Sequence, residues 1–287
     1  MGLDINGVKF ILYAKTLKVH FGETVMIGRQ GLHLQKKALL DLVRKHQNHV
    51  KEDSITTLEA SKSRYADDFL RSVGAYKVDS LDNSDYEGAN LCHDMNLPIP
   101  ENLKNKFDVV LDGGSLEHVF DIRVAFQNCM EMVKVGGHFL GINPANNFMG
   151  HGFYQFSPEF YFTTFSRENG FEIEKVILFE DRKGASWYEV FSPESVRGRV
   201  ILKNSEKTYL LVIAKKIEEK PIFSSAPQQS DYKAIWTGQA NTASDLKSSR
   251  TGKSSFSFAR VTQRLHRFSC WIARKTYFEP RYFQKMK

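Results

Sequence analysis

Long hydrophobic runs and paired cysteines are both absent from this chain of 287 residues. A helix that crosses a bilayer needs roughly 20 consecutive apolar residues, and no run here approaches that length. Cys92, Cys129 and Cys270 are odd in number and far apart, which argues against a disulfide framework or a cysteine zinc site. The first residues also lack the basic region, apolar stretch and cleavage site of a secretory signal. We therefore expect a cytoplasmic protein in a reducing compartment.

Two familiar cofactor motifs are missing as well. There is no HExxH pattern, and Asp112, Glu117 and His118 fall too close together for a convincing set of metal ligands. We therefore expect no metal site. The glycine pattern G-x-G-x-x-G is also absent, which disfavours an enzyme that uses a nicotinamide dinucleotide.

The positive charge of the chain is concentrated at its carboxyl end. The net charge is +7, and residues 259–287 alone hold eight Lys or Arg against one acid. Val261, Leu265, Phe268 and Ile272 are spaced by 4, 3 and 4 residues, which predicts a basic amphipathic helix. Three interpretations stay open for it: docking at the inner membrane surface or on a protein partner, packing on the body, and, least favoured, nucleic-acid binding.

Composition divides the chain into three segments. Residues 1–218 alternate between strand-like apolar runs and amphipathic stretches, which is typical of an α/β domain. Residues 219–258 are rich in Ser, Gln, Lys and Thr and are expected to form a flexible polar linker. Residues 259–287 are the basic, aromatic, helical tail.

The first segment holds seven candidate strands with helical connections between them. The predicted strands cover residues 24–28, 76–82, 89–95, 107–112, 136–143, 171–180 and 208–216. A helical stripe after the first strand consists of Leu32, Leu39, Leu40 and Val43, and two further helices are predicted around 65–73 and 121–134. This order predicts a largely parallel sheet with helices on both faces.

The most informative stretch is residues 107–118, which read FDVVLDGGSLEH. An apolar run ends at Asp112, turns on two glycines and then offers Glu117 and His118. Buried parallel strands have this composition, and open α/β sheets bind ligands at the carboxyl ends of their strands. We therefore expect a ligand site at the end of this strand.

The surroundings of this stretch resemble class I S-adenosylmethionine-dependent methyltransferases. KFDVVLDGGSLEHVFD, a helix and then KVGGHFLGINP are similar to the fourth strand, following helix and fifth strand of that family. The likeness covers roughly residues 20–217. It implies a Rossmann-like seven-stranded methyltransferase sheet, mostly parallel with an antiparallel last strand. A weaker likeness at residues 150–159, GHGFYQFSPE, is to methyltransferase-like proteins of surface-glycan synthesis.

The resemblance implies S-adenosyl-L-methionine as the cofactor, with its methionine end against the loop after the first strand. That loop reads GRQGLH, and its matching positions are Gly28, Arg29 and Gly31. Spaced glycines let a backbone approach a ligand closely. The loop departs from the family pattern at Gln30, where a further glycine is expected, and at Met26, which replaces an acid.

Acids at the ends of later strands match the rest of the cofactor. Asp82 would accept hydrogen bonds from the ribose hydroxyls, because a carboxylate accepts on two oxygens and a diol offers two donors. Asp79 and Asp85 are alternatives to it, and Asp94 matches the residue near the adenine amino group. The positions expected beside the transferable methyl group are Asp112, Gly113 and Gly114.

Two histidines are candidates for the base that an oxygen acceptor needs. His118 follows the fourth strand, and His151 lies in a glycine-punctuated loop after the fifth. The ordinary pKa of imidazole suits proton transfer near neutral pH. Polar neighbours predict an acceptor pocket, and its candidates are Glu117, Asn146, Asn147, Tyr154 and Gln155.

The sequence therefore predicts a methyltransferase that acts on an oxygen of a small-molecule or glycan-type acceptor. The alternative is a non-catalytic methyltransferase-like module that docks on a membrane or protein partner through its basic tail. Each site position also has a structural interpretation: an ordinary turn for GRQGLH, a solvated turn for Asp82 and a polar connecting loop for residues 146–155.

Overall fold

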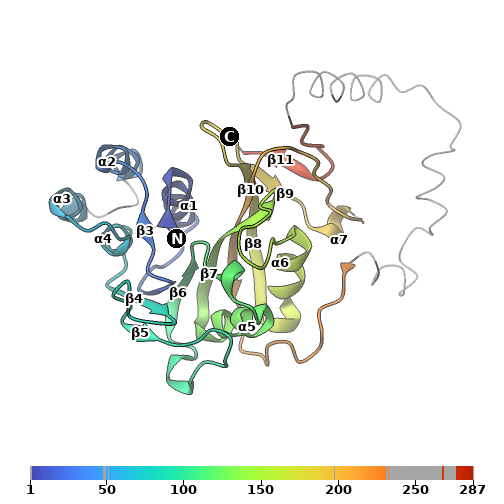
Figure 1. Ribbon diagram of the computed structural model, residues 1–287, viewed down its shortest axis with the longest axis horizontal. Helices are drawn as coiled ribbons and strands as arrows, with labels where there is room; N and C mark the ends of the chain where they lie inside the picture. The colour runs from blue at the N-terminus through green and yellow to red at the C-terminus, as the bar shows by residue number, and fades with distance from the viewer. Residues whose placement is uncertain are drawn as a thin grey trace, which may run out of the picture.

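The computed structural model describes most of the first 230 residues and the carboxyl end of the chain. The described residues are 2–47, 50, 52–196, 198–230, 232, 267 and 276–286. Within them, a twisted sheet runs through the middle of the molecule with helices on both faces (Figure 1).

The main sheet contains nine strands in the described part of the chain. In sheet order they are β11 (Phe283–Lys285), β9 (Tyr188–Val190), β8 (Phe171–Glu180), β10 (Thr208–Lys216), β7 (Val133–Asn146), β6 (Phe107–Asp112), β2 (Glu23–Ile27), β4 (Lys77–Asp82) and β5 (Leu91–Cys92). A separate two-stranded sheet pairs β1 (Gly2–Leu3) with β3 (Gly31–Leu32).

The pairing of the strands makes the sheet mixed. Strands β5, β4, β2, β6 and β7 are parallel neighbours. Strand β10 is antiparallel to both β7 and β8, and the pairs β8–β9 and β9–β11 are antiparallel too. All seven expected strands form, but β9 and β11 extend the sheet, so the expected number of seven is wrong. The expectation of a mostly parallel sheet is wrong as well, because half of the neighbouring pairs are antiparallel.

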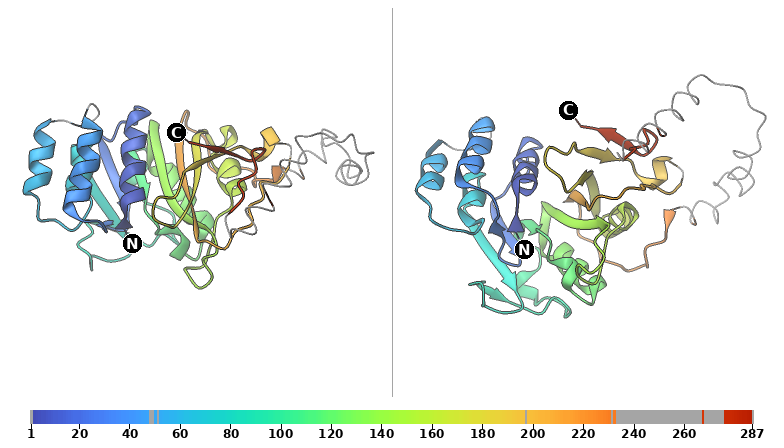
Figure 2. Two further views of the ribbon diagram at one scale, coloured as in Figure 1. Left: turned by 90° about the horizontal axis from the view of Figure 1, so that it is seen from above. Right: turned by 45° about the horizontal axis from the view of Figure 1, so that its top comes forward.

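Helices cover the two faces of the sheet in two groups. The helices are α1 (Ile5–Thr16), α2 (Lys36–Lys45), α3 (Glu52–Ala60), α4 (Asp67–Ser72), α5 (Ile122–Met132), α6 (Pro158–Thr164) and α7 (Pro193–Val196). Short 3₁₀ turns are η2 (Glu101–Leu103), η3 (Leu116–His118) and η4 (Arg167–Asn169). Figure 2 shows α1 to α4 on one side of the sheet and α5 and α6 on the other.

Alternation along the central strands builds a separate apolar core on each face. Val25 and Ile27 pack with α5 and α6, whereas Met26 between them packs with α1 and α4. Strand β6 alternates in the same way: Val110 joins the α5 side, and Val109 joins the α1 side. Side chains of a strand alternate between faces, so the end of β6 presents its last residue beside α5 and α6.

Helix α1 was not expected from the sequence. Asp4 caps it, because its carboxylate accepts from the backbone nitrogens of Asn6 at 2.9 Å and Gly7 at 2.8 Å. The helix buries residues around most of its circumference, and its apolar residues therefore form no clear stripe.

The described end of the chain packs on the body of the protein. Phe283 is buried, and the ring of Phe278 stacks on Tyr188 at 3.8 Å between centroids. Residues 283–285 form a strand there and not a helix. Most of the amphipathic helix expected over 259–275, and most of the linker expected over 219–258, lie outside the described residues. None of the helices in the described ranges has the length and apolar character needed to cross a membrane.

Candidate active site

The carboxyl ends of the parallel strands meet at one edge of the sheet. Ile27 at the end of β2 pairs with Asp112 at the end of β6, and Asp112 pairs with Gly141 in β7. Leu81 of β4 pairs with Ile27 from the other side. The loops that follow these strands therefore lie side by side, as the sequence predicts.

Asp112 is a buried carboxylate that organises the turn after β6. Its Oδ1 accepts from the backbone nitrogens of Ser115 at 2.8 Å and Leu116 at 3.3 Å, which holds the turn η3 against the strand end. Its Oδ2 accepts from the side-chain amide of Asn143 at 2.6 Å. The side chain has no solvent exposure.

Asn143 joins this carboxylate to Glu117 and to Tyr161. Its Nδ2 also donates to Glu117 Oε2 at 3.3 Å, and its Oδ1 accepts from the Tyr161 hydroxyl at 2.6 Å. All of these side chains are buried. Sequence reasoning missed Asn143 and Tyr161. A signal existed for Asn143, because it is a polar residue near the end of an apolar strand next to the one that carries Asp112.

Burial raises the pKa of both carboxyl groups in this network. The neighbouring charge of Glu117 raises the pKa of Asp112 further, while the hydrogen bond from Asn143 partly opposes the rise in each. Two carboxylates this close do not both ionise freely, so they titrate as a pair. Burial also places the pKa of Tyr161 well above its ordinary value, and its hydroxyl is therefore a donor at neutral pH.

A glycine lets the loop after β7 lie directly against Glu117. Gly152 has φ +69°, and a Cβ there would stand 2.7 Å from the backbone oxygen of Glu117. The same oxygen accepts from the backbone nitrogen of Phe153 at 2.7 Å. This close approach brings His151 over the end of β6.

The structure brings together three of the predicted site residues: Glu117, His118 and His151. Nε2 of His151 lies 3.4 Å from Oε1 of Glu117, and the two imidazole rings meet edge to face at 5.0 Å. Partial burial and the neighbouring His151 lower the pKa of His118, which favours its neutral form. The expectation of no metal site considered Asp112, Glu117 and His118; the contact with His151 assembles a different set.

The other polar residues predicted for an acceptor pocket hold the loop itself. Asn146 and Asn147 both donate to Oδ1 of Asn204, at 2.8 and 3.0 Å. Gln155 accepts from the backbone nitrogen of Phe148, and Tyr154 donates to the backbone oxygen of Phe120. Within the loop, only His151 reaches Glu117 with a side chain in the described structure.

The loop after β2 is shaped by Gln30 and not by a further glycine. Gln30 is fully buried and donates from Nε2 to the backbone oxygen of Ile27 at 2.7 Å. Its Oε1 has no hydrogen-bond partner, and a Cβ on Gly113 would stand 2.4 Å from it. Gly28 has φ +68°, which favours glycine, whereas Gly31 lies in β3 and pairs with Gly2.

Arg29 spans the sheet edge from β2 toward the loop after β4. Its guanidinium donates to the backbone oxygen of Glu87 at 3.1 Å and pairs with Asp67 at 3.4 Å. The guanidinium also lies over the ring of Tyr65, 4.2 Å from its centroid. Its Nε is buried and has no partner.

The acids predicted to bind the cofactor differ in the hydrogen bonds and ion pairs that they already make within the fold. Asp79 is buried and bound to Asn90 and Lys77, and the backbone and side-chain nitrogens of Asn96 lower the pKa of Asp94. Asp82 is half-buried at the end of β4, where Oδ1 accepts from the backbone nitrogen of Asn83. Asp82 and Asp94 thus stay at the predicted edge, while Asp79 already has two partners within the fold. The other alternative, Asp85, is exposed.

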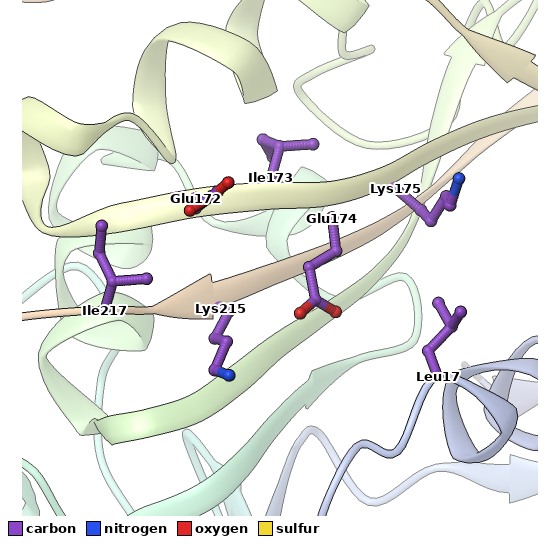
Figure 3. A pocket seen from close by; sticks show the side chains of 7 residues that line it. All are labelled: Leu17, Glu172, Ile173, Glu174, Lys175, Lys215 and Ile217. Atoms are coloured by element: carbon purple, nitrogen blue, oxygen red, sulfur yellow. The ribbon is translucent and has the colours of Figure 1, made fainter.

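A cavity of about 530 Å³ lies at the opposite edge of the sheet (Figure 3). Among its lining residues are Glu174 and Lys175 of β8 and Lys215 of β10. Lys215 pairs with His138, near the amino end of β7, which places the cavity away from Asp112 and Glu117.

No protein-family model matches the sequence, and no curated protein matches it. Solved structures similar to it include a Bacillus halodurans protein provisionally described as a methyltransferase: 10% identity, TM-score 0.40, covering 72% of this chain and 99% of that one. A Listeria monocytogenes protein provisionally described as an S-adenosylmethionine-dependent methyltransferase is 14% identical, with TM-score 0.38, covering 73% and 99%. The methyltransferase CalH in complex with SAH is 10% identical, with TM-score 0.39, covering 74% and 57%. At such identities the likeness concerns the course of the backbone.

Proposed function

We propose that this protein is an S-adenosylmethionine-dependent methyltransferase. The observation that carries the proposal is a pair of orphaned polar atoms at the end of β2: Nε of Arg29, a donor, and Oε1 of Gln30, an acceptor, both buried without a partner. Buried polar atoms in native proteins are almost always hydrogen-bonded, so an unmatched donor and acceptor in adjacent residues point to a ligand. The methionine end of S-adenosylmethionine carries a carboxylate and an ammonium on one carbon. The carboxylate would accept from Nε of Arg29, and the ammonium would donate to Oε1 of Gln30.

The remaining residues of the edge fit the rest of this cofactor. The carboxylate of Asp82 would accept hydrogen bonds from the ribose hydroxyls, and that of Asp94 would accept from the adenine amino group. The sulfonium would lie beside Gly113 and Gly114, at the strand end where the buried Asp112 holds the following turn. When bound, the cofactor supplies a methyl group attached to a positively charged sulfur. The chain would bind it, orient it toward the acceptor and exclude water.

The two imidazoles would remove the proton from an oxygen acceptor. Partial burial and His151 lower the pKa of His118, which favours the neutral imidazole that can accept a proton. His151 is the competing base, and its Nε2 lies 3.4 Å from Oε1 of Glu117. The two rings lie 5.0 Å apart, close enough to serve the same acceptor.

We propose a small-molecule or glycan-type acceptor for this site. Phe120 and Phe153 are exposed next to the histidines and contact each other edge to face at 5.5 Å. Exposed aromatic faces beside polar groups suit a ring that carries both apolar faces and hydroxyls. Docking of the basic tail on a membrane or protein partner would add a second interaction outside the described residues.

Calorimetry with S-adenosylmethionine and its demethylated product tests the proposal. The parent protein should bind both, and Arg29→Ala and Gln30→Ala should each weaken binding about tenfold or more, the loss of one or more buried hydrogen bonds. Arg167→Ala, at an exposed arginine paired with Glu172, is the matched control and should bind as the parent does. Absence of binding at millimolar cofactor would remove the proposal.

One observation favours the second candidate, a non-catalytic binding module. Gln30 fills space beside Gly113 that a glycine in the family pattern would leave open. Such a module would bind anionic vesicles or a protein while binding no cofactor. Replacing Arg260, Arg264, Arg274 and Lys275 with alanine separates the two, because it abolishes docking of a module and leaves cofactor binding of an enzyme intact. Deleting all of residues 259–287 would not distinguish the two candidates, because the deletion also removes strand β11 from the sheet.

A further inference from the structure

We propose that Glu117, His118 and His151 form a binding site for a divalent transition-metal ion. Each of the three offers one ligand atom, and these atoms lie within 4.8 Å of one another. Oε1 of Glu117 and Nε2 of His151 are 3.4 Å apart. Two ligands about 2.0–2.1 Å from a tetrahedral zinc ion are themselves separated by about 3.3 Å, so this pair already has the spacing that a shared ion requires.

The environment of Glu117 leaves one carboxylate oxygen for an ion. Oε2 accepts from Asn143, while Oε1 faces His151. Asn143 is itself held by the Tyr161 hydroxyl at 2.6 Å. Outer hydrogen bonds of this kind orient metal ligands and are a regular part of metal sites. The Glu117 side chain is therefore fixed before any ion arrives.

The loop that supplies His151 is also held in place. The backbone nitrogen of His151 donates to the backbone oxygen of Phe148 at 3.0 Å, and those of Phe153 and Tyr154 donate to the backbone oxygen of Glu117. Gly152 permits this approach, since any larger residue would meet that oxygen. His118 belongs to the turn η3, one residue after Glu117. The three ligands thus come from two segments that are hydrogen-bonded to each other.

The two buried acidic groups at the site favour a bound cation. Asp112 and Glu117 are both buried, and within the described ranges neither has an ion pair with a lysine or arginine. An unpaired buried carboxylate is costly, and a bound divalent ion removes that cost.

The ligand types indicate which ion binds. Two imidazoles with one carboxylate suit first-row transition ions such as Zn²⁺, Mn²⁺ or Fe²⁺, whereas Mg²⁺ and Ca²⁺ prefer oxygen ligands throughout. Three protein ligands also leave coordination positions open, and both histidines are exposed toward solvent.

An open position gives the ion a role that rests on the proposed methyl transfer. An acceptor hydroxyl bound to the ion has a lowered pKa and releases its proton to water. Its oxygen then forms the new bond to the methyl carbon as the bond from that carbon to sulfur breaks, and the sulfonium becomes a neutral thioether. With the ion bound, His118 and His151 are ligands and not bases.

Metal binding can be measured on the full chain without any methyl donor. Chelator-treated protein is titrated with Zn²⁺ against a chromophoric chelator, and with Co²⁺, whose visible absorption reports its coordination. We expect one equivalent to bind, with Mg²⁺ and Ca²⁺ at least 100-fold weaker. His118→Ala and His151→Ala should each lower Zn²⁺ affinity at least tenfold, and His20→Ala, at an exposed histidine outside the cluster, should not.

Two outcomes would overturn the metal site. One is a parent protein that binds less than one equivalent of Zn²⁺; the other is unchanged affinity in both His118→Ala and His151→Ala. Both replaced side chains are exposed, so circular dichroism should show folded variants. Cofactor binding is measured separately in the presence of chelator, so a failure of the metal site and a failure of the proposed methyl transfer give different results.

Discussion

A single amide nitrogen of Asn143 donates to Asp112 at 2.6 Å and to Glu117 at 3.3 Å. These two buried carboxyl groups come from a strand end and from the turn that follows it, while Asn143 comes from the neighbouring strand. The amide therefore ties the acidic pair to β7. It also decides which carboxylate oxygens are occupied and which remain for a ligand.

Replacing Asn143 with leucine should destabilise the protein strongly. Leucine has a similar volume but no donor, so Asp112 Oδ2 and Glu117 Oε2 lose their shared partner, and Tyr161 loses its acceptor. We expect the free energy of unfolding to fall by about 2–4 kcal/mol, measured by urea denaturation at pH 7.5. Asn83→Leu, in an exposed turn, should change it by less than about 0.5 kcal/mol. Equal effects of the two changes would show that the buried amide is not needed.

Gly152→Ala and Gly150→Ala form a matched pair that isolates the contact with Glu117. Both glycines have positive φ, +69° and +81°, so alanine is strained at each by about 1 kcal/mol. Only at Gly152 does the added Cβ meet the Glu117 backbone oxygen; at Gly150 nothing lies within 4 Å. Gly152→Ala should therefore lose at least about 1 kcal/mol more than Gly150→Ala in thermal or urea unfolding. It should also shift the His151 ring resonances by NMR, and similar losses and spectra for the two variants would contradict the close approach.

The stability of the metal-free protein should depend on pH through Glu117. Burial raises the pKa of Glu117 from 4.5 to about 7 in the folded protein, so folding favours its protonated form. The contribution of Glu117 to the free energy of unfolding is therefore highest below pH 4.5, where Glu117 is protonated in both states, and it falls as pH rises from 4.5 toward 7. Glu117→Gln mimics the protonated form and should be more stable than the parent by about 2 kcal/mol at pH 8.

The difference between Glu117→Gln and the parent should shrink toward zero as pH falls to 4.5 and below, because Glu117 of the unfolded parent then becomes protonated as well. Urea denaturation of chelator-treated samples across this range measures it. Asp112 titrates together with Glu117, so Glu131→Gln, at an acid outside the pair, serves as the control for general pH effects. A difference that does not vary between pH 8 and pH 4.5 would show that Glu117 is not protonated by burial.

A double-mutant cycle tests the packing of Gln30 against Gly113. A Cβ at Gly113 would stand 2.4 Å from Oε1 of Gln30, so Gly113→Ala should lower the free energy of unfolding by about 1–3 kcal/mol. In the Gln30→Ala background that side chain is gone, and the same change should cost about 1 kcal/mol less. Additive losses in urea unfolding would place Gln30 away from Gly113.

Much of the fold was predictable because strands and helices leave a pattern of apolar and polar residues in a short stretch of sequence. All seven predicted strands form at least in part, since most are runs of apolar or alternating residues bounded by polar turns; the one predicted over 89–95 is reduced to Leu91–Cys92. The short strands β9 and β11 lack such a run, and their pairing depends on residues far apart in the chain. Helix α1 escaped prediction because it is buried on several sides.

The site was predictable only in part, because its hydrogen bonds join distant residues. Asp112 and Glu117 were recognisable from one strand and its turn. Asn143 lies 31 residues after Asp112, and nothing local tells its amide to face that carboxylate. Asn146 and Asn147 look equally suited to a ligand in the sequence, yet their amides hold the segment around Asn204.

The sequence by itself determined where seven of the strands lie along the chain and the edge at which polar groups gather, because period and turn chemistry are properties of short segments. Tertiary structure alone decided that His151 meets Glu117 and His118, and that Arg29 and Gln30 each keep one buried polar atom without a partner. Those outcomes depend on how loops pack across the sheet edge. Side-chain direction and burial are set by that packing, and the cost of burying a charge or an unmatched polar atom gives each contact its chemical consequence.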